Sequence, residues 1–243
     1  MNPAWIQPRW PAPSRVHALS TTRTGGCSHG PYDSLNLGTH VGDDPAHVLA
    51  NRALLRGALP GEPCWLDQVH GTRVVAAAED EGVVEADAAF SRQSGRVCVV
   101  MTADCLPVLF CDRAGSVVAA AHAGWRGLHA GVLEATIAAM DVAPDQLIAW
   151  LGPAIGPDAF EVGDEVRSAF MEVDRAAEAA FRPSPAPGKW LADIYRLARQ
   201  RLEGAGVGGI HGGDACTVGD PQRFFSYRRD GVTGRMASMI WLD

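Results

Sequence analysis

The sequence lacks the features that mark membrane, exported and nucleic-acid-binding proteins. No apolar run approaches the roughly 18 residues that cross a bilayer, so no membrane helix is predicted. The formal net charge is −7, which argues against a nucleic-acid groove, because such a groove needs a concentrated basic face. Residues 1–14 contain several prolines and no apolar core, so they do not predict a signal peptide, and we expect a cytoplasmic protein.

The cysteines show no regular spacing. None of the six forms a Cys-x-x-Cys pair, and without an export signal we expect reduced thiols, most of them small core residues. Cys98 and Cys111 lie inside apolar runs and fit that description. Cys105 differs, because it stands between Asp104 and the strand-breaking pair Leu106-Pro107.

Length and composition predict an ordinary globular protein. With 243 residues, 47% of them hydrophobic, the chain can bury a large core, and we expect residues 1–243 to form one domain. Strand-like and helical segments mix without strict βαβ alternation, which predicts an α+β (mixed α/β) fold: mixed β-sheets flanked by helices in a layered sandwich. Predicted strands cover residues 15–22, 64–66, 73–77, 86–90, 97–101, 107–111, 117–121, 147–151, 223–227 and 235–242. Predicted helices cover residues 44–58, 126–140, 164–173, 175–181 and 191–202.

Three residues with metal-binding or nucleophilic side chains lie at strand ends or turns. His70 lies between two predicted strands, Cys105 follows strand 97–101, and His122 follows strand 117–121. Rigid strands can present such side chains to one cleft. Two imidazoles and one thiolate would hold zinc with an open fourth position, which is the pattern of catalytic sites. The alternative is a pair of hydrogen-bonded core histidines plus a buried thiol, and sequence spacing does not decide between the two.

Four polar residues near these positions are candidates for binding or catalysis. Arg126 and the first N–H groups of helix 126–140 would form an anion pocket, aided by the helix dipole. Asp104 could orient a histidine or act as general acid or base. Arg23 and Asn36 lie in a glycine-bearing loop and could bind substrate. Each has an equally good alternative as a capping or surface residue. The remaining histidines have no special context and are expected to be structural or surface residues: His17, His29, His40, His47, His129 and His211.

Several motifs resemble those of the laccase-domain protein family. They are STTRTGG (20–26), YDSLNLG (32–38), WLDQVHG (65–71), TADCLPVLF (102–110), HAGWRG (122–127), GPAIGPDAFEVGDEV (152–166) and FFSYRRDGVTGRM (224–236). Together they extend over nearly the whole chain. Members of this family are described variously as polyphenol oxidases, peptidoglycan editing factors and purine nucleoside phosphorylases.

The resemblance implies a role for each matching position. It places a metal ion, usually zinc, on His70, Cys105 and His122, the metal ligands of the QVHG, TADC and HAGWRG motifs. We expect Cys105, His122, Asp104 and Arg126 to act in catalysis. Gln68 is expected to join Arg23 and Asn36 in substrate binding. The implied fold is similar to the catalytic domain of the cytotoxic necrotizing factor toxins.

The implied activity is phosphorolysis of purine nucleosides. Adenosine, inosine, guanosine or methylthioadenosine would react with phosphate to give the free base and a ribose 1-phosphate, and adenosine deamination is a further implied activity. A zinc ion that lowers the pKa of bound water to about 7 would suit deamination. An anion pocket at Arg126 and Arg23 would suit phosphate. The implied partners are a nucleoside and phosphate, without nucleic acid or membrane.

Three other activities remain open. A hydrolase with Cys105 as nucleophile and His122 as base would fit the peptidoglycan-editing description. A copper-dependent polyphenol oxidase would fit the two-histidine, one-cysteine ligand set, which also binds copper. However, the chain has no His-x-His pair of the kind that holds a multicopper cluster, and Met101 is the only methionine near the site in sequence. A zinc-stabilised binding module would show metal-dependent folding without turnover.

Overall fold

The computed structural model describes residues 4–77 and 82–243, and the strands of this part of the chain form two large and two small sheets. The order of the six-stranded sheet is β14 (Gly209–Gly212), β10 (Leu147–Leu151), β8 (Leu106–Asp112), β9 (Val118–Ala123), β6 (Ala88–Ser91) and β4 (Val74–Ala76). The order of the four-stranded sheet is β1 (Val16–Ser20), β15 (Met236–Leu242), β7 (Val97–Thr102) and β2 (Pro63–Cys64). Both are mixed sheets, because each contains parallel and antiparallel neighbours.

Short strands and helices complete the chain. The small sheets contain β11 (Glu161–Gly163), β13 (Lys189–Ala192) and β12 (Phe181–Pro183), and β3 (Leu66–Asp67) with β5 (Val84–Glu85). The helices are α1 (Pro45–Arg56), α2 (Trp125–Ala130), α3 (Val132–Met140), α4 (Asp164–Val173), α5 (Ile194–Gly204) and α6 (Tyr227–Asp230). Single 3₁₀ segments cover Gly30–Tyr32, Pro144–Gln146 and Arg175–Ala180. No helix among the described residues is long and apolar enough to cross a membrane.

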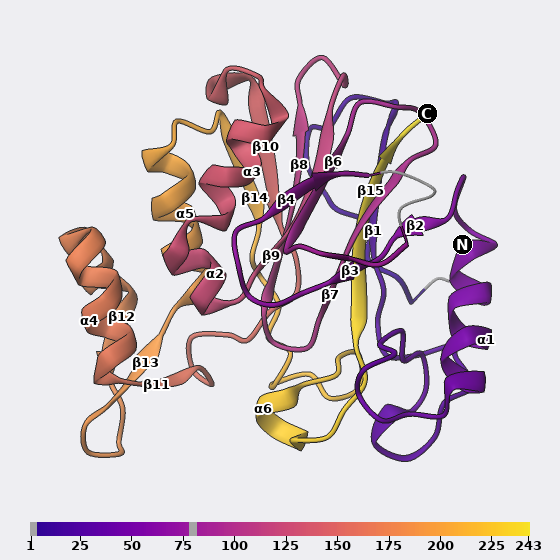
Figure 1. The fold of residues 1–243 in the computed structure, drawn as a ribbon. Helices are drawn as coiled ribbons and strands as arrows, with labels where there is room; N and C mark the ends of the chain where they lie inside the picture. The colour runs from indigo at the N-terminus through magenta and orange to yellow at the C-terminus, as the bar shows by residue number, and fades with distance from the viewer. Residues whose placement is uncertain (1–3, 78–81) are drawn as a thin grey trace.

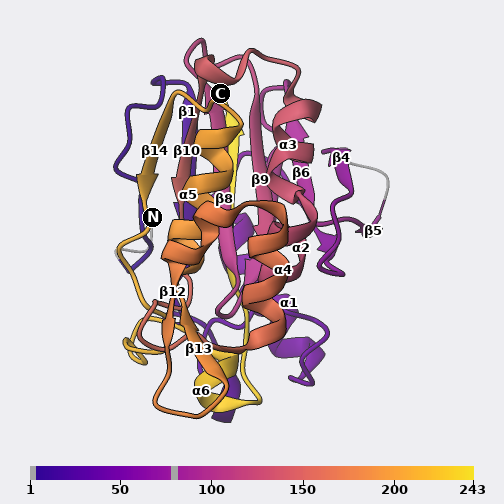
Figure 2. The ribbon, with the colours of Figure 1, turned by 90° about the vertical axis from the view of Figure 1, so that its left-hand side faces the viewer.

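The elements stack in layers, with the two large sheets in the middle. Figure 1 shows α2, α3 and α5 on one side of the six-stranded sheet and α1 beyond the four-stranded sheet. Figure 2 shows α2, α3 and α5 in front of the six-stranded sheet. Separate apolar clusters fill the spaces between layers: one between helices and sheet, one between the sheets, and one under α1. The predicted α+β layered sandwich of mixed sheets is confirmed.

Strand β7 shows why a continuous apolar run becomes a fully buried strand. Successive side chains of a strand point to opposite faces. Val97 and Val99 belong to the cluster under α1, whereas Cys98 and Val100 belong to the cluster between the sheets. Both faces of β7 are therefore covered by apolar clusters, so its sequence does not alternate between apolar and polar residues.

The three central runs are strands as predicted, but they divide between two sheets. β8 and β9 pair with each other as an antiparallel hairpin. β7 pairs instead with β15 and β2. The turn that carries Cys105, between β7 and β8, therefore joins the two large sheets at one end of the sandwich.

Three predicted elements are wrong in extent or type. The predicted helix 126–140 is broken into α2 and α3 by Gly131, whose φ of 101° lies in the left-handed region that glycine tolerates. Residues 223–227, predicted as a strand, form a turn that leads into α6, because Ser226 caps that helix through its side chain. Helix α5 begins at Ile194 after an Asp193 cap, three residues later than predicted, since Leu191 pairs within β13.

Candidate metal and substrate site

Three side chains from different parts of the chain meet at the end of the sandwich. His70 follows β3, Cys105 lies in the turn between β7 and β8, and His122 lies in β9. One ligand atom of each lies within 4.8 Å of the others, and Nε2 of His70 is 3.7 Å from Sγ of Cys105. His122 is buried, Cys105 is partly exposed and His70 is exposed. The fold therefore assembles the predicted cluster with one side open.

Asp87, which lies just before β6, holds both histidines in place. Its carboxylate accepts hydrogen bonds from three consecutive backbone N–H groups, those of Val69 (3.2 Å), His70 (2.9 Å) and Gly71 (2.6 Å). It also contacts Nδ1 of His122 at 2.8 Å. Burial acts to raise the pKa of Asp87, but these hydrogen bonds and the charge of His122 outweigh it and lower the pKa. The carboxylate therefore leaves Nε2 of His122 free to face the cluster.

Sequence reasoning missed Asp87. The expectation that Asp104 orients a histidine is wrong, because Asp87 does so. Asp104 has a φ of 86°, and its buried carboxylate accepts hydrogen bonds from Thr217 Oγ1 (2.5 Å), Ser226 Oγ (3.0 Å) and the Arg228 N–H (2.7 Å). It thus ties the thiol turn to the loop before α6. The only sequence signal for Asp87 is a lone carboxylate beside a strand.

The electrostatics of the cluster favour a thiolate at Cys105 beside a protonated imidazole at His122. Burial acts to raise the pKa of the Cys105 thiol, but the positive charge of His122 and hydrogen bonds to both histidines bring it down to about 6. Burial acts to lower the pKa of His122, and the Cys105 charge with the Asp87 carboxylate raises it to about 9. Cys105 is therefore available as a thiolate near neutral pH, the form that binds metals and attacks electrophiles.

The cluster fits a metal ion. Metal–nitrogen and metal–sulfur bonds of about 2.0–2.3 Å place neighbouring ligand atoms roughly 3.5 Å apart, and the 3.7 Å between His70 Nε2 and Cys105 Sγ is close to that value. A Cβ at Gly124 would lie 2.7 Å from Cδ2 of His70 and 2.9 Å from Sγ of Cys105. Only a glycine at this position lets the two side chains approach each other. Asp87 supplies the carboxylate that zinc-binding histidines normally contact.

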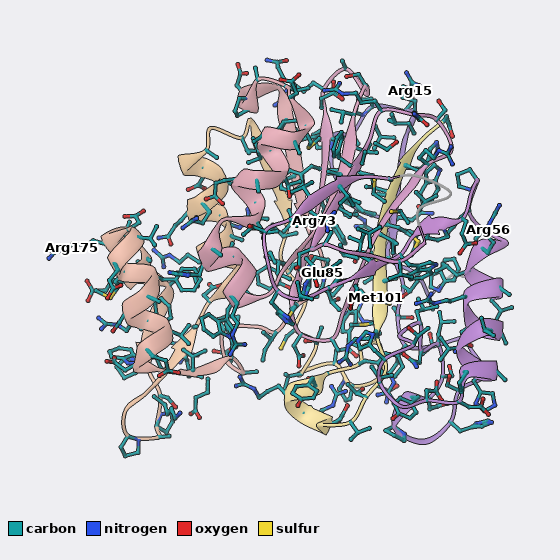
Figure 3. The ribbon with its side chains drawn as sticks, viewed as in Figure 1. Arg15, Arg56, Arg73, Glu85, Met101 and Arg175 are labelled. Atoms are coloured by element: carbon teal, nitrogen blue, oxygen red, sulfur yellow. The ribbon has the colours of Figure 1, made fainter. Side chains whose placement is uncertain are left out.

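A cavity of about 620 Å³ opens beside the cluster. Its lining comes from several elements. Strands β3 and β7 and the residue before β15 contribute Leu66, Asp67, Met101 and Arg235, helices α2, α5 and α6 contribute Trp125, Arg126, Ile194, Tyr227 and Arg228, and loops contribute His40, Gln68, Ile155 and Phe160. Met101 is labelled in Figure 3. The lining therefore combines aromatic and apolar side chains with polar and charged ones.

Comparison with known proteins decides the family. A family model described as multi-copper polyphenol oxidoreductase laccase matches residues 17–243. The chain belongs to this laccase family. A protein of Pseudomonas aeruginosa named purine nucleoside phosphorylase is 59% identical over 240 residues, with 99% of each chain covered. The purine nucleoside phosphorylase YfiH of Escherichia coli is 60% identical over 240 residues, with 98% of each chain covered.

A solved structure within the same group shares the fold. The crystal structure of a Neisseria meningitidis protein matches with a TM-score of 0.95 at 56% identity and covers 99% of both chains. The resemblance inferred from the motifs is thus confirmed for the laccase family.

The remaining predicted site residues of this laccase-family chain divide into two groups. Arg126 lines the cavity and lies over the ring of Trp125, with its guanidinium carbon 4.5 Å from the ring centre. Gln68 also lines it, but its amide is bonded to the Met101 backbone, with Nε2 donating at 2.8 Å and Oε1 accepting at 2.7 Å. Gln68 therefore fixes the cavity wall.

Arg23 and Asn36 are not among the residues that line the cavity. Arg23 donates to the carbonyls of Asp33 (2.8 Å) and Pro221 (3.1 Å). Asn36 is fully buried and bonds to neighbouring loops. Four residues with charged or imidazole side chains that sequence reasoning did not select line the cavity instead: His40, Asp67, Arg228 and Arg235. Asp67, Arg228 and Arg235 lie in motifs 65–71 and 224–236, which was the signal available for them, whereas His40 lies outside every motif.

Proposed function

We propose that this protein is a zinc-dependent purine nucleoside phosphorylase with a secondary adenosine deaminase activity. The observation that carries the proposal is the His70, Cys105 and His122 cluster, whose open side faces a cavity large enough for a nucleoside. The names of the relatives at 59% and 60% identity point to the same activity. Adenosine, inosine, guanosine and methylthioadenosine are the proposed substrates, with phosphate as co-substrate.

The zinc ion would be held by the three ligands and by no protein group at its fourth position. When bound, it would supply Lewis-acid chemistry at the wall of the cavity. Two imidazoles and a thiolate suit zinc, and they also accept copper. Asp87 keeps a proton on Nδ1 of His122, so that Nε2 presents its lone pair to the ion.

Different lining residues would bind different parts of the substrates. A purine is a flat ring, which suits contact with Trp125, Phe160 and Ile155. In phosphorolysis a phosphate oxygen bonds to C1′ of the ribose while the C1′–N9 bond breaks. The base leaves with the electron pair and takes up a proton. Arginine side chains of the cavity would hold the phosphate charge during this step.

We assign roles to the predicted catalytic residues on the same basis. Cys105 and His122 lie at the reaction centre as metal ligands. Arg126 reaches the cavity from the N-terminus of α2 and would stabilise negative charge there. Asp104 acts through the backbone that it ties together, and is a positioning residue. A cytoplasmic location would suit this chemistry, because Cys105 must stay reduced.

The test is a product assay on adenosine with and without phosphate, using protein of known metal content. Phosphate-dependent release of adenine that is lost in Cys105→Ala would support the proposal. Cys27→Ala is the matched control, because Cys27 is also a partly exposed free thiol but does not line the cavity. Inosine formed without phosphate would make the enzyme chiefly a deaminase.

A thiol hydrolase is the second candidate, favoured by the lowered pKa of Cys105 next to His122. It predicts inactivation by iodoacetamide but not by chelators, and no turnover of any nucleoside. A polyphenol oxidase predicts oxidation that depends on copper and is absent with zinc alone.

A further inference from the structure

Arg235 carries a positive charge at the cavity and forms no ion pair with any carboxylate of the described residues. It precedes β15, lines the cavity and is partly buried. Its Nη1 donates to the carbonyls of Thr233 (3.1 Å) and Gly234 (3.0 Å). Within residues 4–77 and 82–243, Nε and Nη2 form no hydrogen bond and the guanidinium forms no ion pair. Buried charges in proteins are normally paired, so an unpaired one next to a cavity indicates a missing anion.

The Arg235 side chain is held in position by the loop of residues 36–38. Asn36 Oδ1 accepts a hydrogen bond from the Arg235 N–H at 2.9 Å, and the Leu37 N–H donates to the Arg235 carbonyl at 3.1 Å. A Cβ at Gly38 would lie 2.8 Å from Cγ of Arg235, so the glycine makes room for the arginine stem. The guanidinium is therefore presented from a fixed backbone, which lowers the entropy lost when it binds a ligand.

The negative charges of Cys105 and Asp104 act on Arg235, but neither group forms an ion pair or hydrogen bond with its guanidinium. The carboxylate of Asp104 already accepts hydrogen bonds from Thr217, Ser226 and the Arg228 backbone. Burial lowers the pKa of Arg235, while the negative charges of Cys105 and Asp104 act in the opposite direction. Arg235 nonetheless remains protonated at any pH at which the protein is folded.

His40 also lines the cavity and adds a hydrogen-bond donor. Burial and then the charge of Arg235 lower the pKa of His40, so the imidazole is neutral near pH 7 and offers one N–H. Asp67, which also lines the cavity, is exposed, and its negative charge opposes this shift without reversing it.

We propose that Arg235 and His40 form an oxyanion subsite that holds the phosphate in the cavity. The inference rests on the proposed function, whose nucleoside base would contact the aromatic lining residues. Arg126 and Arg228 suit the phosphate less well, because both are exposed, whereas Arg235 is partly buried. Arg126 is stacked on Trp125, and Nη1 of Arg228 donates to the Glu161 carbonyl at 2.7 Å. A planar guanidinium with two free donors matches phosphate in a bidentate geometry.

The first test measures phosphate binding without turnover. Inorganic phosphate is titrated into the zinc-loaded protein by calorimetry, with no nucleoside present. Arg235→Gln is expected to weaken binding about 30-fold, because charge-assisted hydrogen bonds are lost. Arg235→Lys keeps the positive charge but not the planar guanidinium with its two parallel donors. Its phosphate affinity is expected to lie between those of the wild type and Arg235→Gln. Arg199→Gln is the matched control, because Arg199 also donates to two backbone carbonyls (3.3 and 2.6 Å) and does not line the cavity.

The second test uses kinetics to separate the subsite from the fold. In Arg235→Gln the KM for phosphate should rise by a similar factor, while the KM for the nucleoside changes little. His40→Gln should raise the phosphate KM by about fivefold through loss of one neutral hydrogen bond. A wild-type zinc content and an unchanged midpoint of urea denaturation would show that Arg235→Gln is folded.

The outcomes distinguish a failure of the phosphate subsite from a failure of the proposed function. An unchanged phosphate KM in Arg235→Gln, or an effect confined to Arg126→Gln, would overturn the subsite and leave phosphorolysis standing. Arg235-dependent phosphate binding without any phosphorolysis would keep the subsite and overturn the proposed function. A wild-type protein that binds no phosphate at millimolar concentrations would overturn the subsite directly.

Discussion

Replacing Gly124 by alanine would place a methyl group inside the ligand cluster. The added Cβ would lie 2.7 Å from Cδ2 of His70 and 2.9 Å from Sγ of Cys105. Carbon atoms normally approach to about 3.5–4.0 Å, so His70 would have to move by roughly 0.8 Å or more. The backbone itself accepts alanine, because Gly124 has φ −59° and ψ 157°. Any effect therefore comes from the contact with the two ligands.

The displacement is large compared with the tolerance of a metal site. Functional groups must be held within about 0.5 Å of their working positions, and a misplacement of about 1 Å commonly costs roughly 100-fold. We therefore expect Gly124→Ala to bind zinc about 100-fold more weakly, which corresponds to about 2.7 kcal/mol. The assay is competition for zinc against a chromogenic chelator at neutral pH.

Gly204→Ala is the matched control for this variant. Gly204 ends α5, and nothing lies within 4 Å of the Cβ that would be added there. Zinc affinity should stay at the wild-type value, and the free energy of unfolding should rise by a few tenths of a kcal/mol or up to about 1 kcal/mol. If folded Gly124→Ala bound zinc as tightly as Gly204→Ala, the three side chains would not form the metal site described above.

Three further predictions concern buried carboxylates and the break between α2 and α3. Asp87→Asn should weaken zinc binding about 10- to 100-fold and lower the free energy of unfolding by about 3 kcal/mol, measured by chelator competition and urea denaturation; unchanged zinc affinity would contradict the role of Asp87. Asp112 is also buried, and its pKa is lowered because hydrogen bonds from Ser116 and Val117 outweigh the opposing effect of burial. Its stabilisation is present above the unfolded pKa of about 3.9 and is lost as pH falls through the lower folded value. Asp112→Asn should therefore cost about 1–3 kcal/mol at pH 7, with the difference from wild type shrinking below about pH 4 and with zinc affinity unaffected; a difference independent of pH would refute this. Gly131→Ala forces alanine to a φ of 101° and should cost at least about 1 kcal/mol in urea denaturation, whereas a neutral effect would mean that α2 and α3 can rearrange there.

Local pattern alone predicted most of the central strands and the helices with clear caps. Residues 97–101, 107–111 and 117–121 are apolar at strand length, and α1 follows the Asp44 cap and Pro45 that mark a helix start. The predictions of strands and helices fail where contacts with distant segments outweigh the local conformational preference of the sequence. Phe224 and Phe225 are both fully buried and pack with Ala103 and Met236, so contacts with other segments fix this turn.

The amino-acid sequence by itself singled out the three residues of the cluster, because each lies in a motif that resembles the laccase-domain family. It could not identify the residues that hold these three side chains in position through hydrogen bonds. Asp87 acts through backbone N–H groups of residues 69–71 and through His122, which lies 35 positions later. Asp104 acts through Thr217, 113 positions away.

Only the tertiary structure decided which polar residues face the cavity. Arg23 bonds to backbone carbonyls, and Asn36 bonds to backbone groups and to the Asp43 carboxylate, while Arg235, whose N–H donates to Asn36, forms no ion pair among the described residues. The physical reason is that local sequence sets the spacing of apolar residues in a helix or strand and the residues that cap a helix. Whether a charged side chain is paired, buried or open to a ligand depends on which distant segments the sheets bring beside it.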